Sequence, residues 1–184
     1  MIFAQPAPEQ IPSLLALWKM AFGDWNGFWE TFLETGFSPE RCRCAAENGQ
    51  ITAALTWLDG SCENQKIAYI YAVVTHPDHR GKGLCRQLLA DTHALLKAQG
   101  YAAAMLVPAE PELRTMYEKL DYQTCTYVEE FSCEAGDTPL SIRAMGMEEF
   151  AALRRKYLPD KAVLQEGENL RFLSRQAQFY TGDN

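Results

Sequence analysis

The strongest constraint on the fold is an apolar run followed by a glycine turn and then by an amphipathic helix pattern. Residues 67–74 are nearly continuously apolar, which predicts a strand in the interior of a sheet. Residues 80–85 read Arg-Gly-Lys-Gly-Leu-Cys, and leucines at helical spacing then continue to Gln99. Glycines let a backbone approach a ligand, and the N–H groups of a helix start favour anions, so the segment predicts a phosphate site. A glycine turn with solvated cations is the alternative.

The elements around this segment predict a mixed α/β fold. Asn48-Gly49 between apolar runs predicts a hairpin of residues 42–58, and Asp59-Gly60 predicts a further turn before a strand at 66–75. Residues 101–107 predict the strand that follows the helix, and the two strands should be joined by a right-handed parallel crossover. We therefore expect a central, mixed and partly parallel sheet flanked by helices. Further expected elements are short strands at 2–5 and 122–131 and helices at 9–22, 25–35 and 111–120.

The helix expected at 25–35 is rich in aromatic residues. Phe28, Trp29, Phe32 and Leu33 share its apolar face. Core packing explains such a face, and a wall of a substrate pocket is the alternative.

Residues 135–184 differ in character from the preceding chain. Residues 136–139 look like a joint, and two helical patterns at about 147–157 and 168–179 follow with little strand material. We expect a main domain at 1–134 and a C-terminal helical extension at 135–184, which one interpretation treats as the remnant of a second lobe. The extension also leaves room for a homodimer.

The composition narrows the partners and the compartment. A net charge of −7 argues against non-specific nucleic-acid binding, although Arg80, Lys82 and Arg86 form a local positive patch. No stretch approaches the ~20 apolar residues of a membrane span, and the start has no signal-peptide layout, so we expect a cytoplasmic protein without a membrane partner. The six cysteines form no CxxC pair, which predicts reduced structural thiols and no metal site.

The neighbourhood of the glycine turn separates the classes of phosphate site. A Walker A loop needs a different spacing and a hydroxyl, and a Rossmann fingerprint needs a third glycine where this chain has Arg86. Residues 76–89 read His-Pro-Asp-His-Arg-Gly-Lys-Gly-Leu-Cys-Arg-Gln-Leu-Leu. They resemble the acetyl-CoA-binding motif R/Q-x-x-G-x-G/A of the GNAT superfamily of N-acetyltransferases. Arg80 and Gly83 match it, and Cys85 stands where the family has Gly or Ala.

A second segment resembles the same family. Residues 106–109 and 113–122 look like its downstream strand and its Y-x-K-L-G-F helix end, with Asp121-Tyr122 in place of the usual Gly-Phe. Two motifs in the right order are more specific than one, and the resemblance covers about residues 2–133.

The resemblance implies a role for each site residue. Backbone N–H groups of the glycine loop would hold the pyrophosphate of acetyl-CoA, the co-substrate. Backbone groups of the preceding strand would contact the pantetheine arm and polarise the thioester carbonyl. Tyr117 matches the family's usual proton donor, and completing an apolar helix face is its alternative role. The implied cofactor-binding residues are Val73, Val74, Thr75, Arg80, Gly81, Lys82, Gly83, Leu84, Cys85 and Arg86.

The general base is not assigned by the sequence. Family members often place a glutamate on the strand before the loop, where this chain has Tyr69 and Tyr71 but no carboxylate. His76, Glu47, Asp24 and a water chain stay open as candidates.

The sequence therefore predicts an acetyl-CoA-dependent N-acetyltransferase that transfers the acetyl group directly to a primary amine of a small molecule or peptide. Cys85 lies on the phosphate loop, a poor place for a covalent relay. The negative net charge favours cationic acceptors such as polyamines, aminoglycosides or a lysine or N-terminal amine. An acyl-CoA-sensing domain without catalysis is the main alternative, and a nucleotide-binding protein is a remote one.

Overall fold

The computed structural model describes residues 2–125, 143 and 145–180 of the chain. The chain divides into two compact units, Met1–Leu106 with Met147–Asn184, and Val107–Gly146.

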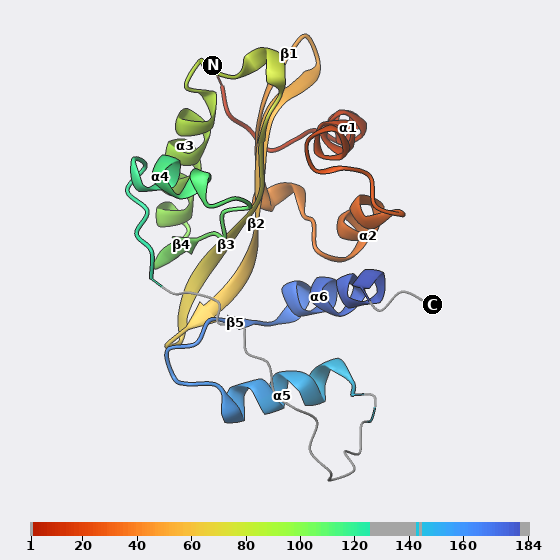
Figure 1. Cartoon of the computed structure of the whole chain (residues 1–184), viewed down its shortest axis with the longest axis vertical. Helices are drawn as coiled ribbons and strands as arrows, with labels where there is room; N and C mark the ends of the chain where they lie inside the picture. The colour runs from red at the N-terminus through yellow and green to blue at the C-terminus, as the bar shows by residue number, and fades with distance from the viewer. Residues whose placement is uncertain (1, 126–142, 144, 181–184) are drawn as a thin grey trace. The chain divides into compact units, whose positions relative to one another are not determined.

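The first unit is built on a five-stranded mixed sheet (Figure 1). Four strands follow the order β1-β2-β3-β4, and β5 pairs with β2. All pairings are antiparallel except that of β3 with β4, which is parallel. The parallel pair confirms the expected crossover through a helix, and with it the mixed α/β fold. The strands are β1 Cys42–Glu47, β2 Gln50–Cys62, β3 Gln65–Thr75, β4 Ala103–Met105 and β5 Leu164–Gln165.

The turn after β2 lies later than the sequence predicts. The Asn48-Gly49 hairpin is confirmed, but the turn expected at Asp59-Gly60 is wrong, because β2 continues to Cys62 and the chain reverses at Glu63 and Asn64, with φ values of 49° and 61°. Gly60 serves a different purpose. A Cβ atom on Gly60 would lie 3.2 Å from the Leu164 carbonyl oxygen, so the glycine lets β5 approach β2 closely.

Helices cover both faces of this sheet (Figure 1). Helices α1 (Ile11–Phe22), α2 (Phe28–Thr35) and α6 (Gly167–Tyr180) lie on one face, and α3 (Leu84–Ala98) lies on the other. The hydrophobic core on the first face gathers residues from α1, α2, α6 and the sheet, with Trp18 and Phe32 completely buried. The aromatic face of α2 belongs to this core, as the core-packing interpretation of that helix predicts.

Several element boundaries differ from the sequence prediction. Helix α2 begins at Phe28 and not at Trp25, because Asn26 and Gly27 adopt positive φ values of 44° and 81°. The expected strand at 2–5 is reduced to a single bridge between Ala4 and Cys44. The strand at 101–107 shortens to β4. In the strand expected at 122–131, residues 122–125 are not extended into a sheet, and the remainder lies outside the described residues.

The C-terminal part of the chain contains the two helices that the sequence predicts. These are α5 (Met147–Tyr157) and α6, and both belong to the first unit. The expected domain boundary at residues 134 and 135 lies outside the described residues.

The second unit contains α4 (Glu112–Glu118). Tyr117 on this helix is 8% exposed, and its ring meets that of Tyr122 edge to face with a 5.6 Å centroid separation.

Across the described ranges, no helix has the length and apolar character needed to cross a bilayer. The same residues contain no group of three or more histidine, cysteine or acidic side chains that could hold a metal ion.

Candidate functional site

The glycine turn joins β3 to α3 through a short 3-10 helix, Pro77–His79. Gly81 and Gly83 adopt φ values of 74° and 73°, which L-residues rarely do, and Gly83 is the residue that precedes the first turn of α3. A Cβ atom on Gly81 would meet nothing within 4 Å, so conformation and not crowding requires glycine here. Leu84 is buried and anchors the start of α3, whereas residues 80–83 are exposed. The turn therefore presents its backbone N–H groups to solvent, where an anion can reach them.

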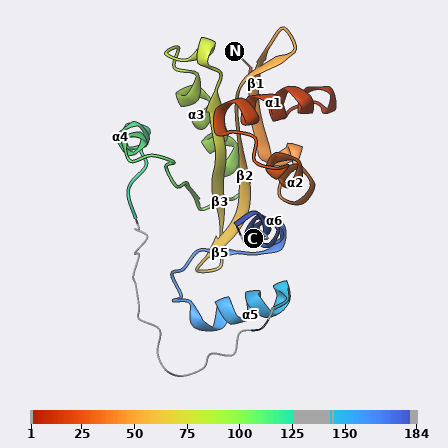
Figure 2. The same cartoon turned by 45° about the vertical axis from the view of Figure 1, so that its right-hand side comes forward.

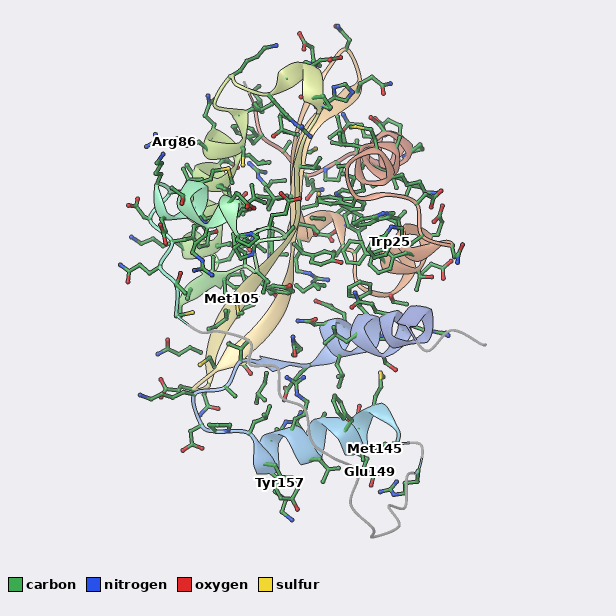
Figure 3. The ribbon with its side chains drawn as sticks, viewed as in Figure 1. Trp25, Arg86, Met105, Met145, Glu149 and Tyr157 are labelled. Carbon is green, nitrogen blue, oxygen red and sulfur yellow. The ribbon has the colours of Figure 1, made fainter. Side chains whose placement is uncertain are left out.

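Three cations surround this turn. The Arg80 guanidinium donates from Nε to the Thr75 carbonyl oxygen at 3.1 Å, and Lys82 Nζ donates to the Asp78 carbonyl oxygen at 3.1 Å. Arg86, in the first turn of α3, is exposed and points away from the sheet (Figure 3). The first turn of α3 contains no acidic residue, so the local charge reinforces the positive end of the helix dipole.

The strand before the turn contains a β-bulge at Ala72. Thr56 of β2 pairs with Tyr71, and Ala54 pairs with Val74, so two residues of β3, Ala72 and Val73, stand opposite one residue of β2. Ala72 has a φ of 51°, which is an unusual conformation for a residue with a Cβ atom. A bulge takes backbone groups out of the regular ladder and is common next to functional sites.

The other edge of β3 is open along a stretch that includes this bulge. In the described part of the chain, β4 pairs with β3 only at Ile67, Ala68 and Tyr69. The edge from there to Thr75 therefore has no strand partner among the described residues and can accept an extended ligand. Val74 is 5% exposed and fixes the strand in the core, whereas Val73 and Thr75 are half-buried.

The structure thus brings together the implied cofactor residues at 73–75 and 80–86 along one strand, one turn and one helix start. Tyr117 lies in the second unit and is not part of this grouping. The bulge at Ala72 is the feature that sequence reasoning missed. Alanine gives no signal for a positive φ, unlike the glycines and asparagines that mark the turns.

Cys85 lies at the end of the turn as a half-buried free thiol. Burial raises the pKa of this thiol above its ordinary value, so it is protonated and weakly nucleophilic near neutral pH. This property argues against an acyl-cysteine intermediate.

The candidate general bases lie in two different parts of the first unit. His79 Nδ1 lies 3.6 Å from the Glu47 carboxylate, and the neighbouring His76 accepts the Asp78 backbone N–H at its Nδ1 over 3.3 Å. Asp24 instead binds Lys19 at 3.0 Å at the end of α1. The two histidines border a groove of about 440 Å³ that is otherwise lined by α1 and the start of β2: Ser13, Ala16, Leu17, Met20, Gln50, Ile51 and Thr52.

Comparisons with known proteins identify the family. The acetyltransferase (GNAT) domain family matches residues 5–125. A comparison with curated proteins finds no match. Among solved structures, glucosamine-6-phosphate N-acetyltransferase from Arabidopsis thaliana is 16% identical, with a TM-score of 0.55 over 72% of this chain and 98% of that one.

Two further solved structures share the fold. An acetyltransferase from Trypanosoma brucei is 16% identical, with a TM-score of 0.54 over 72% of this chain and 99% of that one. A GNAT family N-acetyltransferase from Escherichia coli, solved in complex with CoA, is 21% identical, with a TM-score of 0.54 over 63% of this chain and 66% of that one. The match over residues 5–125 shows that the chain belongs to the GNAT family of N-acetyltransferases, enzymes that use acetyl-CoA as their co-substrate.

Proposed function

We propose that the protein transfers the acetyl group of acetyl-CoA directly to a primary amine, and that residues 73–75 and 80–86 bind the acetyl-CoA. The observation that carries this proposal is the bulge at Ala72 beside an edge of β3 that has no strand partner among the described residues, in a strand that a short 3-10 helix connects to the exposed glycine turn. Acetyl-CoA is an extended molecule with an anionic end, and these three features follow one another in the order that such a molecule needs.

The glycine turn is suited to the pyrophosphate. Backbone N–H groups from Gly81 to Arg86 surround the start of α3, where the helix dipole favours negative charge. The side chains of Arg80 and Lys82 are held by backbone carbonyl groups, which keeps two positive charges beside the turn.

The edge of β3 is suited to the pantetheine arm. An extended amide-containing ligand can add to this edge as a further strand, through the backbone groups of Val73, Val74 and Thr75. The bulge leaves a residue of β3 outside the regular β2–β3 pairing, and a backbone N–H freed in this way would stabilise negative charge that develops on the thioester oxygen.

Two residues support direct transfer of the acetyl group without a covalent acyl-enzyme: Cys85 and Tyr117. The Cys85 thiol has a raised pKa and cannot readily act as an acyl carrier. Tyr117 is the proposed donor of a proton to the departing thiolate, and it acts through its position because a phenol with a pKa of ~10 is a weak acid.

The acceptor is proposed to be a cationic amine. The chain carries a net charge of −7, and a negative surface attracts polyamines, aminoglycosides or a lysine or N-terminal amine. The amine must lose a proton before it attacks. Near the glycine turn, the first unit offers three groups that could accept this proton: the paired His79 and Glu47, and the neighbouring His76.

Calorimetric titration with acetyl-CoA, together with CoA release in the presence of a panel of amines, tests the proposal. We expect binding that weakens with rising salt, turnover of at least one amine, and no competition from ATP. Lys82→Ala should weaken binding about tenfold, a loss of about 1.4 kcal/mol, whereas Lys97→Ala, at the exposed far end of α3, should leave it unchanged. Absence of acetyl-CoA binding would refute the function, and binding without turnover of any amine would favour a sensor.

A further inference from the structure

The C-terminal helix α6 is part of the hydrophobic core that backs the bulge of β3. Phe172 on α6 is 2% exposed. Its ring lies 4.8 Å from Phe32 and 5.8 Å from Phe28, both on α2, and 5.9 Å from Tyr71 on β3, measured between centroids. Figure 2 shows α6 directly beside α2. One residue of the C-terminal segment thus connects α2 with the strand that carries the bulge.

The fit between Phe172 and its surroundings is close. Gly36, at the end of α2, has an ordinary negative φ, but a Cβ atom placed on it would lie 3.0 Å from Phe172 Cβ. The glycine therefore provides space for the Phe172 side chain, and its backbone conformation does not require glycine. This part of the α2 region is shaped to receive α6.

Polar contacts fix the start of α6 against the sheet. Glu168 forms a 2.9 Å ion pair with Arg41, and the buried Asn169 donates from Nδ2 to the Asp59 carbonyl oxygen at 3.2 Å. Just before the helix, β5 pairs with β2. The helix is consequently held in one position, and Phe172 with it.

Tyr71 is the residue immediately before the bulged Ala72. Its ring packs against Phe32 at 5.3 Å as well as against Phe172. A positive φ at alanine is strained and persists only when the surrounding structure fixes it. On one side of the bulge the buried Val74 supplies such an anchor, and on the other side Tyr71 does. If Tyr71 were free to shift, the strand could slip into regular pairing with β2 and the bulge would be lost.

We propose that Phe172 is a positioning residue for acetyl transfer: it holds the Tyr71 ring and thereby maintains the bulge at Ala72. This inference rests on the proposed function, because the bulge is the place where a backbone N–H would meet the thioester oxygen. The pyrophosphate turn at 80–86 lies beyond Val74, whose buried side chain anchors the strand on that side of the bulge. Loss of the Phe172 ring should therefore lower the rate of transfer more than the affinity for acetyl-CoA.

Phe172→Leu tests the proposal against a matched core variant. Phe37→Leu removes a ring from the same aromatic cluster, and among the described residues the Phe37 ring meets the rings of Trp18 and Phe32 and not that of Tyr71. Both variants should unfold at lower temperature than the parent protein, so rates are compared well below both transitions. We expect Phe172→Leu to lower kcat about tenfold with an acetyl-CoA Kd within about twofold of the parent, and Phe37→Leu to change kcat less than about twofold. Equal loss of kcat in the two variants would overturn the proposal.

A second substitution separates positioning from general stability. Glycine adopts a positive φ without strain, so Ala72→Gly in the Phe172→Leu background should recover part of the lost kcat. A purely structural role for Phe172 predicts no recovery, because glycine adds flexibility to a weakened strand.

The conformation of the bulge can be measured in the absence of any substrate, and therefore independently of the proposed function. The Ala72 Cα and Cβ chemical shifts report the backbone conformation, and they should move towards extended values in Phe172→Leu but not in Phe37→Leu. Unchanged shifts in Phe172→Leu would overturn the positioning role even if the enzyme is active. Failure of the parent protein to bind acetyl-CoA would instead overturn the proposed function and leave the shift experiment decisive for Phe172.

Discussion

At the scale of single residues, the Tyr117 hydroxyl is the group with the most specific proposed task. Tyr117→Phe removes the proton that we propose for the departing thiolate and keeps the buried ring that meets Tyr122. We expect kcat to fall about 100-fold, the lower end of what general acid catalysis contributes, with little change in acetyl-CoA affinity. Steady-state CoA release and calorimetric titration measure the two quantities.

Tyr122→Phe is the matched control for this prediction. It removes a hydroxyl from the adjacent ring of the same unit, 5.6 Å away. A kcat that falls equally in the two variants, or a Tyr117→Phe enzyme with full activity, contradicts the assignment of Tyr117 as the acid.

Cys44 provides a residue-scale prediction about alkaline stability. Burial raises the pKa of its thiol to about 11, against a smaller opposing effect from the Arg43 charge, and the thiol donates to the Ala4 carbonyl oxygen at 3.4 Å. The ordinary thiol pKa is near 9, so above that pH the unfolded chain loses a proton that the folded chain keeps. The contribution of this thiol to the free energy of unfolding is therefore fully present below pH 9 and declines as the pH rises towards 11.

Thermal unfolding at about pH 8 and about pH 10 measures this decline. Cys44→Ala should lose less stability than the parent protein between the two pH values, because one of the thiols that is protonated only in the folded state is gone. Identical losses in both proteins would contradict the prediction.

At the scale of elements, the sequence predicts the regular parts well and the irregular ones poorly. Helices α1, α3, α5 and α6 follow from the spacing of apolar residues, and the β1–β2 hairpin follows from Asn48-Gly49. The sequence predicts the end of β2 too early, because Asp59-Gly60 has turn composition, while the close approach of β5 that explains Gly60 is a tertiary effect. The bulge of β3 was missed for a related reason. Its anchors, Tyr71 and Val74, are apolar residues that look the same in a regular strand.

The glycine turn is the element whose function can be tested most cleanly. Gly81 and Gly100 both have positive φ, 74° and 79°, and a Cβ atom on either would meet nothing within 4 Å. Alanine at each position should therefore cost about the same stability, roughly 1 kcal/mol. Only Gly81→Ala should weaken acetyl-CoA binding, by about tenfold, because it alters the backbone that we propose for the pyrophosphate.

Chemical unfolding and calorimetric titration of both variants measure these effects. Equal stabilities with different affinities support the proposed role of the turn. Equal affinities would show that the exposed glycine turn does not hold the ligand.

At the scale of the whole molecule, the C-terminal segment is the part that sequence reasoning described least completely. The sequence predicts its helices, because amphipathic spacing is local information, but not what those helices pack against. The GNAT match ends at residue 125, whereas Phe172 and Leu170 from beyond it are buried in the first unit. Gly36 and Gly60, both within the matched region, provide space for this later segment. Such complementarity becomes visible only when positions distant in sequence are placed side by side.

A chain that ends at residue 134 tests how far the first unit depends on this segment. Removing α6 takes away Phe172, Leu170 and Asn169, which are 2%, 6% and 1% exposed, and uncovers Phe32 and Tyr71. Loss of one buried phenylalanine side chain costs about 3–5 kcal/mol, and a whole domain is stable by only about 5–15 kcal/mol. We therefore expect the shortened chain to lack a cooperative urea transition by circular dichroism. In the full chain, Phe172→Ala should lower the free energy of unfolding by about 3–5 kcal/mol, and Phe150→Ala, at a side chain that is 45% exposed on α5, by less than about 0.5 kcal/mol. If the shortened chain unfolded cooperatively at the same urea concentration as the full chain, the buried residues of α6 would be dispensable for the fold, and the positioning role of Phe172 would lose its structural basis.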